Sequence, residues 1–493
     1  MNNKYDKQNR MLIAFILALI VAIVFLLTKM YGESRAGKAK PTQMSSVTTE
    51  TSATIEDEPD KEDVKTTEPE PETDKEEKTP PSVKETTPVE PKEIVKETKS
   101  PSEPTKLPVK KDVYEPIGVP DEVRGVWFSY HEWEDAPKNE AEFKAYADEV
   151  MENLTDLHMN TIYVHVRADS DAMYPSEIFP WSKYITGIQG EDPGYDPFLY
   201  MVEAAHAHGI RIHAWINPYR VTHKDCTWED VCADNPARIW YFSGERGNDR
   251  LVLLHDGQYY YNPSKEEVRK LIENGVKEIL EHYDVDGIHL DDYFYPTLND
   301  GDKSLCFDYP DYVSSGSELS ATEYRRENVN TLISELYSIV KGYDENIEFG
   351  ISPAGNLDNL YSDRQYFTDV EKWMSEPGYT DYIIPQLFWG FETKTKDKKS
   401  APWAYKTNLN RWNKLKRSDD VKLYIGLPIY LAGTDTYDNN STSEWLRHDD
   451  IISRQVTTAR KQSKSTGFVF YAYSSFFKET SEKEVGNLMK IFK

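Results

Sequence analysis

The sequence predicts a (β/α)8 barrel of the TIM type, an α/β fold with long loops after its strands, preceded by a transmembrane helix and a disordered linker. Two observations indicate the barrel. From residue 117 onward, short apolar runs alternate with helical stretches. Eight such runs over about 375 residues match the size of this fold. A doubly wound sheet is the alternative, but no glycine-rich phosphate turn follows the first strand.

Residues 1–32 are predicted to form a short cytoplasmic tip and a signal-anchor helix. The uncharged run Met11 to Thr28 has 18 residues and follows Lys4, Lys7 and Arg10, and this length is at the lower edge of what spans a bilayer. We therefore expect a single-pass protein of the cell membrane, with its C-terminal domain outside the cytoplasm. The alternative is a secreted protein whose signal peptide is cleaved.

Residues 33–116 are predicted to form a disordered linker. They are rich in Pro, Thr, Glu and Lys, and Tyr114 is their only aromatic residue. Such a composition cannot bury enough apolar surface to fold. The linker would hold a domain of residues 117–493 away from the membrane.

The elements of that domain follow from its runs of apolar and aromatic residues and from the helical patterns between them. The expected strands are 123–128, 161–167, 211–217, 287–293, 347–353, 381–389, 422–430 and 467–473. The clearest helices are 140–157, 197–208, 265–282, 321–341, 407–416, 448–464 and 481–492. Two insertions, 221–262 and 296–320, follow strand ends, where barrel enzymes build substrate clefts.

Charge and cysteine content exclude several classes of protein. The net charge is -27, most of it after residue 117, which opposes binding to a phosphate backbone and argues against a nucleic-acid partner. The three cysteines do not make a disulfide scaffold. Cys226 and Cys232 are close enough in sequence to pair, which would leave Cys306 over. Because no CxxC or Cys/His pattern is present, we expect no metal and no cofactor.

Polar and aromatic side chains cluster at the ends of the predicted strands. His165, His213 and His289 fall on successive strands with the same parity, so their side chains are expected to point into one cleft. His289 and Asp291 share a face of their strand, and Asp292 takes the other. The residues predicted to bind substrate are His165, Arg167, His213, Trp215, Asn217, Tyr219, His289, Tyr293, Gln386, Trp389 and Tyr471.

Several long motifs resemble the glycosyl hydrolase-like 10 family of bacterial envelope proteins. They are RGVWFS from residue 124, HAWINPYR from residue 213, YDVDGIHLDDYFYP from residue 283 and PQLFW from residue 385. The resemblance runs from about residue 121 to the C-terminus. It implies a glycosidase-type barrel that acts on cell-wall glycan, and it implies no cofactor.

The chain departs from more remote glycosidase barrels at two points. Ser352 and Pro353 stand where α-amylase-like enzymes carry a carboxylic acid after the fifth strand, and His289 replaces their arginine. Tyr293 stands where chitinase-like barrels have an acidic residue. The resemblance therefore transfers one catalytic carboxylate, Asp291, and leaves the second unassigned.

Glycoside hydrolysis usually needs two carboxyl groups, one protonated and one ionised. We expect Asp291 to be the nucleophile or base, kept ionised by Arg167 or His289. Asp292 is the predicted partner if strand curvature brings it into the cleft. Substrate-assisted catalysis by an N-acetyl group would need only one acid. Alternative acids on loops are Asp169, Asp171, Glu132 and Glu392.

These expectations describe an anchored glycoside hydrolase that acts on peptidoglycan strands. One alternative is a non-catalytic module that binds cell-wall glycan on a degenerate barrel, since the fifth-strand acid is missing. Another is a metal-dependent hydrolase or deacetylase that uses His213, His289 and Asp291. The absence of an HxH or HExxH pattern argues against metal chemistry.

Overall fold

The computed structural model describes residues 104–110, 114–224, 226–298, 307–395, 397, 399–434, 443–462 and 464–493. The predicted membrane helix, the linker up to residue 103 and Cys306 lie outside these residues. Among the residues that are described, no helix combines the length and the apolar character needed to cross a bilayer.

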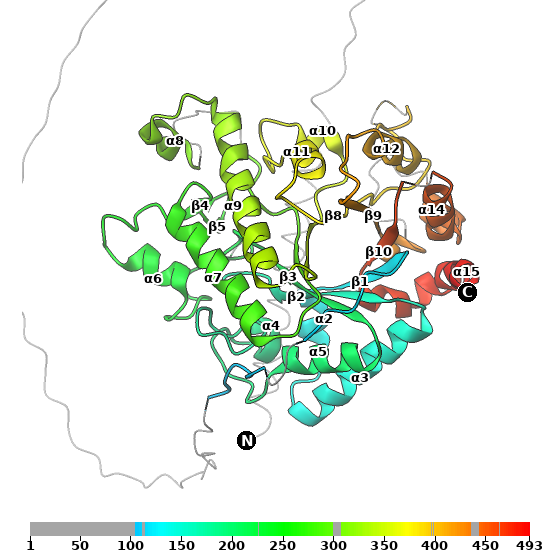
Figure 1. Cartoon of the computed structure of the whole chain (residues 1–493), viewed down its shortest axis with the longest axis horizontal. Helices are drawn as coiled ribbons and strands as arrows, with labels where there is room; N and C mark the ends of the chain where they lie inside the picture. The colour runs from blue at the N-terminus through cyan, green and yellow to red at the C-terminus, as the bar shows by residue number, and fades with distance from the viewer. Residues whose placement is uncertain are drawn as a thin grey trace, which may run out of the picture. The chain divides into compact units, whose positions relative to one another are not determined.

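Eight parallel strands close into a barrel in the order β1-β10-β9-β8-β7-β6-β3-β2, which confirms the predicted (β/α)8 barrel. Figure 1 shows the strands at the centre with helices around them. The barrel strands are β1 Val123–Phe128, β2 Thr161–Arg167, β3 Arg211–Ile216, β6 Gly287–Leu290, β7 Glu348–Ile351, β8 Tyr382–Ile383, β9 Lys422–Leu427 and β10 Gly467–Tyr471.

One helix packs outside the barrel after each strand. Their starts follow ordinary capping chemistry: the Asn139 side chain accepts from Glu142 N in α3, and Ser320 and Glu323 form a capping box in α9. These helices are α3 Glu140–Asp156, α5 Pro197–Ala207, α7 Glu266–His282, α9 Ala321–Tyr343, α11 Val370–Ser375, α12 Tyr405–Trp412, α14 Ile451–Arg460 and α15 Glu482–Phe492.

The loops carry short elements of their own. The first insertion holds α6 Pro236–Phe242 and an antiparallel hairpin of β4 Val252–His255 and β5 Gln258–Tyr261. The described part of the second insertion holds α8 Tyr309–Ser315. The remaining short helices are α2 Tyr130–Asp135, α4 Lys183–Thr186, α10 Leu357–Leu360, α13 Glu444–Arg447, η2 Ile429–Leu431, η3 Tyr473–Phe477 and η4 Glu479–Ser481.

Two strands end well before their predicted C-termini. The pairing of β6 with β7 stops at Leu290, so the two following aspartates leave the sheet. The β8 strand keeps only two residues, and beyond it Gln386 makes isolated bridges to Ala354 and Gly426. Pro385 contributes to this early end because it lacks the N–H that a sheet ladder needs. The functional residues of both segments therefore lie on loops.

Large rings fill the barrel interior, and small residues on neighbouring strands make room for them. An added Cβ at Gly287 would overlap the His213 ring, and one at Gly350 would overlap the Tyr382 ring. The interior rings are Trp127, Tyr163, His213, Trp215, His289, Tyr382 and Tyr424. The barrel is thus a packed core that closes the floor of any cleft above it.

The described end of the predicted linker lies against the barrel. The Tyr114 ring stacks on His206 with centroids 4.6 Å apart, and its hydroxyl donates to Asp286 at 2.7 Å. The Ile117 N–H donates to the same carboxylate at 2.6 Å. Because Asp286 precedes β6, this contact is at the N-terminal face of the barrel.

Gly350→Ala tests whether the small interior positions are required by packing. The new methyl group collides with the Tyr382 ring, and we expect a loss of roughly 1–3 kcal/mol in the free energy of unfolding, measured in urea. Gly342→Ala in α9 is the matched control, because no atom outside that helix lies within 4 Å of its added Cβ. Equal stabilities of the two variants would contradict the packing argument.

Candidate active site

A cavity of about 280 Å³ lies at the C-terminal ends of the barrel strands. Its walls come from β1, β2, β3 and β10 and from the loops that follow β3, β6, β7 and β8. The lining residues are Trp127, Tyr130, His165, Trp215, Asn217, Arg220, Asp291, Asp292, Tyr293, Ser352, Gln386, Phe388 and Tyr471. This is the end of the barrel at which the sequence places a cleft.

Two neighbouring carboxyl groups, Asp291 and Asp292, both line this cavity. Their side chains are only 3% and 8% exposed, respectively. Strand alternation predicted that they point apart, but alternation ends with β6 at Leu290, and both side chains turn to the same space. The backbone N–H of Tyr293 donates to Asp291 Oδ1 at 3.2 Å and fixes the position of that carboxyl group.

Burial raises the pKa of both carboxyl groups. Burial, and after it the charge of Asp292, hold the pKa of Asp291 well above its usual value. Burial raises the pKa of Asp292 to about 7, while the nearby Arg220 charge opposes the shift. The pair therefore retains a proton near neutral pH.

Arg220 supplies the positive charge of the cavity. Its Nε donates to Ala168 O and to Asp169 Oδ1, both at 3.0 Å. Its guanidinium lies over the rings of Tyr130 and Tyr293, at 5.6 and 5.1 Å from their centroids. Burial lowers the pKa of Arg220, but the negative charges around it, Asp169 first, raise it by more, so the guanidinium stays charged.

Several cavity atoms have no hydrogen-bond partner among the described residues. They are both ring nitrogens of His165, Asn217 Oδ1 and Arg220 Nη2, whereas the Trp215 side chain hydrogen-bonds the Asp291 carboxyl group. Burial lowers the pKa of His165, so its neutral ring offers one donor and one acceptor. The His165 ring also stacks on Trp215, with centroids 3.8 Å apart. Because unpaired buried polar atoms are costly, these groups are suited to bind a polar ligand.

Five predicted substrate-binding residues lie outside the cavity lining, and Arg167, Tyr219 and Trp389 are three of them. The pairing of β2 with β3 shifts between His165 and Arg167, and Arg167 Nη2 donates instead to the carbonyls of Asn217 and Pro218, at 2.9 and 3.0 Å. Tyr219 is fully buried in the hydrophobic core. Trp389 is half-buried beyond the cavity, and its carbonyl accepts from Gln455 Nε2 at 2.9 Å.

His213 and His289 point into the barrel as predicted, but they lie below the cavity. Trp127 Nε1 donates to His289 Nε2 at 3.1 Å, which leaves the His289 proton on Nδ1, 3.2 Å from the Tyr382 hydroxyl. That hydroxyl lies 2.9 Å from His213 Nδ1 and can donate to it. Burial lowers the pKa of His289 to about 3, so it is neutral and cannot keep Asp291 ionised. Arg220 is the cation beside the aspartates.

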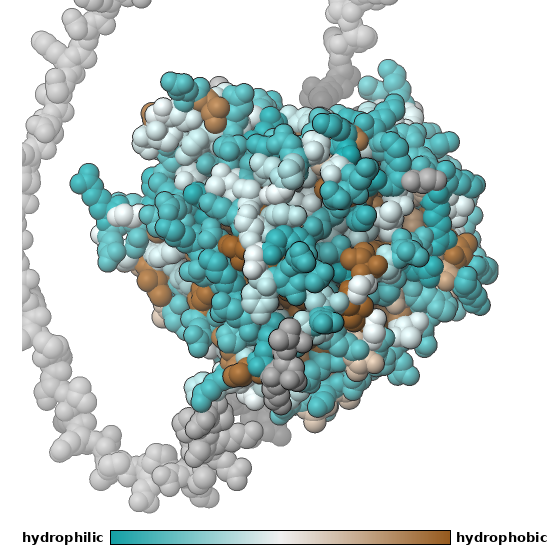
Figure 2. Space-filling model, in the orientation of Figure 1, coloured by the Kyte–Doolittle hydropathy of each residue, from teal (hydrophilic) through white to brown (hydrophobic). Residues whose placement is uncertain are grey.

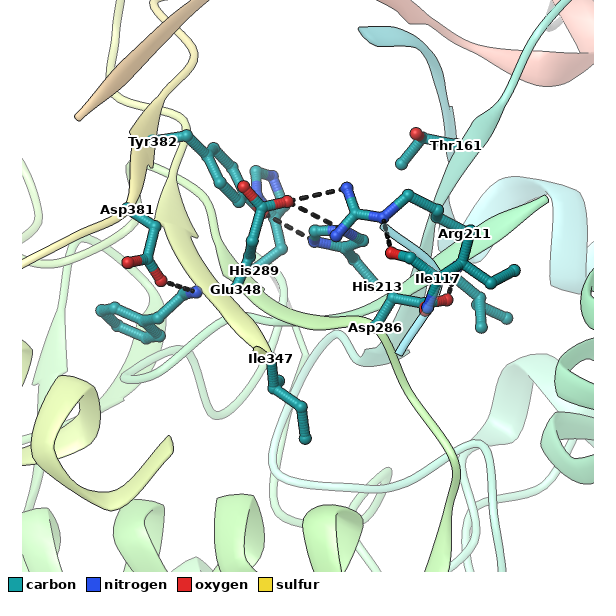
Figure 3. Close-up of polar contacts among 12 residues, drawn as sticks. Ile117, Thr161, Arg211, His213, Asp286, His289, Ile347, Glu348, Asp381 and Tyr382 are labelled. Atoms are coloured by element: carbon teal, nitrogen blue, oxygen red, sulfur yellow. Dashed lines mark hydrogen bonds and ion pairs between the residues drawn. The ribbon is translucent and has the colours of Figure 1, made fainter. Parts of the chain in front are cut away.

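Below these rings, a buried ion pair closes the barrel. Arg211 Nη1 lies 2.7 Å from Glu348 Oε2, and His213 Nε2 lies 3.8 Å from the same oxygen. Figure 3 shows Arg211 and His213 on one side of this contact, with Tyr382 and His289 adjacent. Both histidines are thus held by polar partners inside the core. Within the part of the chain that is described, no cluster of His, Cys, Asp or Glu is arranged to hold a metal ion.

The alternative acids on loops have other partners. Asp169 pairs with Arg220, and Gln189 Nε2 donates to Asp171 at 3.1 Å. Glu132 accepts from the Ser129 and Ser474 hydroxyls. These three carboxylates are buried. The fourth carboxylate, Glu392, lies at the surface in an ion pair with Arg447.

Sequence reasoning missed five lining residues, which are Trp127, Tyr130, Arg220, Ser352 and Phe388. Arg220 ends the HAWINPYR motif, and a charged residue so soon after a strand end could have indicated a place in the cleft. Trp127 lies at a position of β1 from which strand alternation points the side chain into the barrel, so the sequence could have predicted it. The two cysteines considered for a disulfide, Cys226 and Cys232, are free thiols.

The sequence model of the glycosyl hydrolase-like 10 family matches residues 122–446. Glycosyl hydrolase YngK of Bacillus subtilis is 32% identical over 343 residues, which are 66% of this chain and 62% of YngK. Glycosyl hydrolase DigH of Escherichia coli K12 is 33% identical over 308 residues, 57% of this chain and 65% of DigH. The chain therefore spans less than two thirds of the length of these relatives.

Among solved structures, the glycoside hydrolase domain of PgaB (BpsB) from Bordetella bronchiseptica has the same fold. The TM-score is 0.51 at 14% sequence identity, and the match covers 74% of this chain and 99% of that domain. At this identity the likeness concerns the barrel architecture alone.

Asp292→Asn tests the burial of the paired carboxyl groups. The folded state raises the pKa of Asp292 from 3.8 to about 7, so it disfavours the ionised form, and wild-type stability declines as pH rises from about 4 to 7. The asparagine side chain of the variant does not ionise, so the folded state loses no stability at this position as the pH rises. We expect a gain on the order of 2–4 kcal/mol in the free energy of unfolding at pH 8.

The same comparison at pH 4 is expected to show little difference, because Asp292 is then protonated in the folded wild type. Asp148→Asn, on the exposed face of α3, is the control and should show no pH-dependent gain. A gain of the same size at both pH values would point to packing and not to ionisation.

Proposed function

Because the chain belongs to the glycosyl hydrolase-like 10 family, we propose that it hydrolyses glycosidic bonds in bacterial cell-wall glycan, the strands of peptidoglycan. The observation that carries the proposal is the buried pair Asp291 and Asp292, which shares a cavity with Arg220 and several aromatic side chains. Hydrolysis of a glycosidic bond usually uses two such carboxyl groups.

The electrostatics assign different roles to the two aspartates. Burial and the charge of Asp292 both raise the pKa of Asp291, and we give Asp291 the role of general acid that protonates the leaving oxygen. Asp292 then acts as the nucleophile or base at the anomeric carbon. Arg220 stabilises the carboxylate by its charge. The sequence predicted Asp291 as the nucleophile or base, and we propose the acid role for it instead.

Aromatic rings and unpaired polar atoms would hold the sugar. Trp127, Phe388 and Tyr471 enclose one side of the cavity, with ring centroids between 6.0 and 6.3 Å apart. Their faces suit the apolar faces of sugar rings. The free atoms of His165 and Asn217 are placed to bind hydroxyl or N-acetyl groups.

We also propose that the protein acts in the cell wall while it is anchored in the membrane. The apolar run from Met11 to Thr28 would anchor the chain in the cell membrane, and residues 33–103 would extend the barrel into the wall. Secretion after signal cleavage would deliver the same barrel to the same polymer. Neither cofactor nor nucleic acid enters this mechanism.

Asp291→Asn is the direct test of the catalytic role. The chain is incubated with peptidoglycan, both intact and stripped of its peptides, and the released sugars are measured by mass spectrometry. We expect release to fall by about 10²–10⁴-fold with the fold retained, because the amide cannot donate the catalytic proton. Asp148→Asn should behave as wild type. Undiminished release by the Asp291→Asn variant would refute the mechanism.

The same experiment separates the enzyme from a non-catalytic binding module. A module would be pulled down on the polymer but would release no sugar from either substrate, even as wild type. The masses of released fragments would also distinguish hydrolysis from lytic cleavage, which leaves anhydro ends.

A further inference from the structure

We propose that the insertion after β3 carries a second glycan-binding surface outside the catalytic cavity. This aromatic platform consists of Trp228, Tyr241, Phe242 and Tyr259, and its ligand is the continuing strand of the polymer. The inference rests on the proposed function, because it assigns a place to the sugars that the cavity does not enclose.

The four rings of the platform form one contact cluster around Trp228. The Trp228 ring centroid lies 4.3 Å from that of Tyr259, 4.7 Å from Tyr241 and 5.5 Å from Phe242. Tyr241 and Phe242 also contact each other, with centroids 5.1 Å apart. Each ring thus limits the motion of its neighbours, and the cluster presents a fixed surface.

Two of these rings face solvent although they are large and apolar. Tyr241 is 43% and Phe242 is 60% exposed, and Ile239 on the same helix is also exposed. In Figure 2 the surface at the position of α6 carries a brown patch among teal side chains. Grouped apolar exposure of this kind is typical of a surface that binds something.

The backbone beneath the platform is well anchored. Arg238 Nη1 donates to the Trp228 carbonyl at 2.6 Å, and its guanidinium lies 5.9 Å from the Phe242 ring centroid. Asn235 caps α6 by accepting from Ala237 N at 2.9 Å. A surface held in place before binding loses little conformational entropy when the ligand arrives.

The backbone beneath the platform is hydrogen-bonded to the chain segment that leaves the cavity wall. Arg220, which lines the cavity, forms an isolated bridge with Tyr260. The next residue, Val221, donates its N–H to the carbonyl of Tyr259 at 3.0 Å. The platform is therefore held by the chain segment that leaves the cavity wall, and a glycan strand leaving on this side would meet it.

The size of the cavity and the charge of the chain favour a glycan over a membrane. Pockets that enclose drug-sized ligands measure about 300–1,000 Å³, so a cavity of about 280 Å³ encloses few sugars and a polymer must continue outside it. Glu229, Asp230 and Asp234 are exposed beside the platform, and the net charge is -27. These charges oppose an anionic lipid surface.

The test measures polymer binding and catalysis separately. In the 493-residue chain carrying Asp291→Asn, the added double substitution Tyr241→Ala/Phe242→Ala is expected to weaken binding to insoluble peptidoglycan by about tenfold or more. With Asp291 intact, the double variant should lose a similar factor on the polymer and keep the wild-type rate on short soluble fragments. Tyr343→Ala is the control, because this ring is 45% exposed at the end of α9, on the opposite face.

The possible outcomes are distinct. Unchanged polymer binding by the double variant would overturn the platform while the proposed hydrolase stands. If the wild-type chain releases no sugar, the proposed hydrolase activity is refuted, and the binding measurement still tests whether the platform binds the polymer. Binding of wild type to anionic lipid vesicles that the double variant loses, with polymer binding intact, would assign the surface to a membrane. Phe242→Trp, which keeps a ring, should retain binding and separates ring loss from local unfolding.

Discussion

The interior of the barrel is occupied by a hydrogen-bonded column of rings, and the site above it depends on that column. Trp127, His289, Tyr382 and His213 are joined end to end, with the Arg211–Glu348 ion pair beneath them. Buried polar groups must be paired, and each member of the column pairs the next. These buried rings pack together below the cavity and close its floor.

Burial above this closed floor raises the pKa values of the two neighbouring aspartates. In water two such groups would both ionise near pH 4. Here burial opposes charge, and Arg220 supplies partial compensation for one carboxylate. A pair that retains a proton near neutral pH follows from the packing of the barrel together with a single cation. Neither a metal nor a cofactor is needed to obtain this pair.

Strand parity predicted much of the site and failed where the strands are irregular. It placed His165, Trp215 and Asp291 in the cleft, and the alternation of eight apolar runs with helical stretches predicted the barrel itself. It misplaced Arg167, because a shift in the pairing of β2 turns that side chain away. It separated Asp292 from Asp291, because the strand ends before them. Strand parity predicts the side to which a side chain points but not its depth along the barrel axis. His289 therefore points into the barrel as predicted, but it lies in a layer below the cavity.

The contact of Tyr114 and Ile117 with Asp286 has a mechanical consequence. It fixes the entering chain to the N-terminal face of the barrel, while the cavity opens at the C-terminal face. Any force transmitted along the preceding chain would first meet Thr105, which donates from its N–H and hydroxyl to Asp192 at 2.7 and 2.6 Å, and then Lys110, which lies 3.1 Å from Asp284. These contacts would share the load with Asp286 before it reached the aspartate pair at the far end of β6.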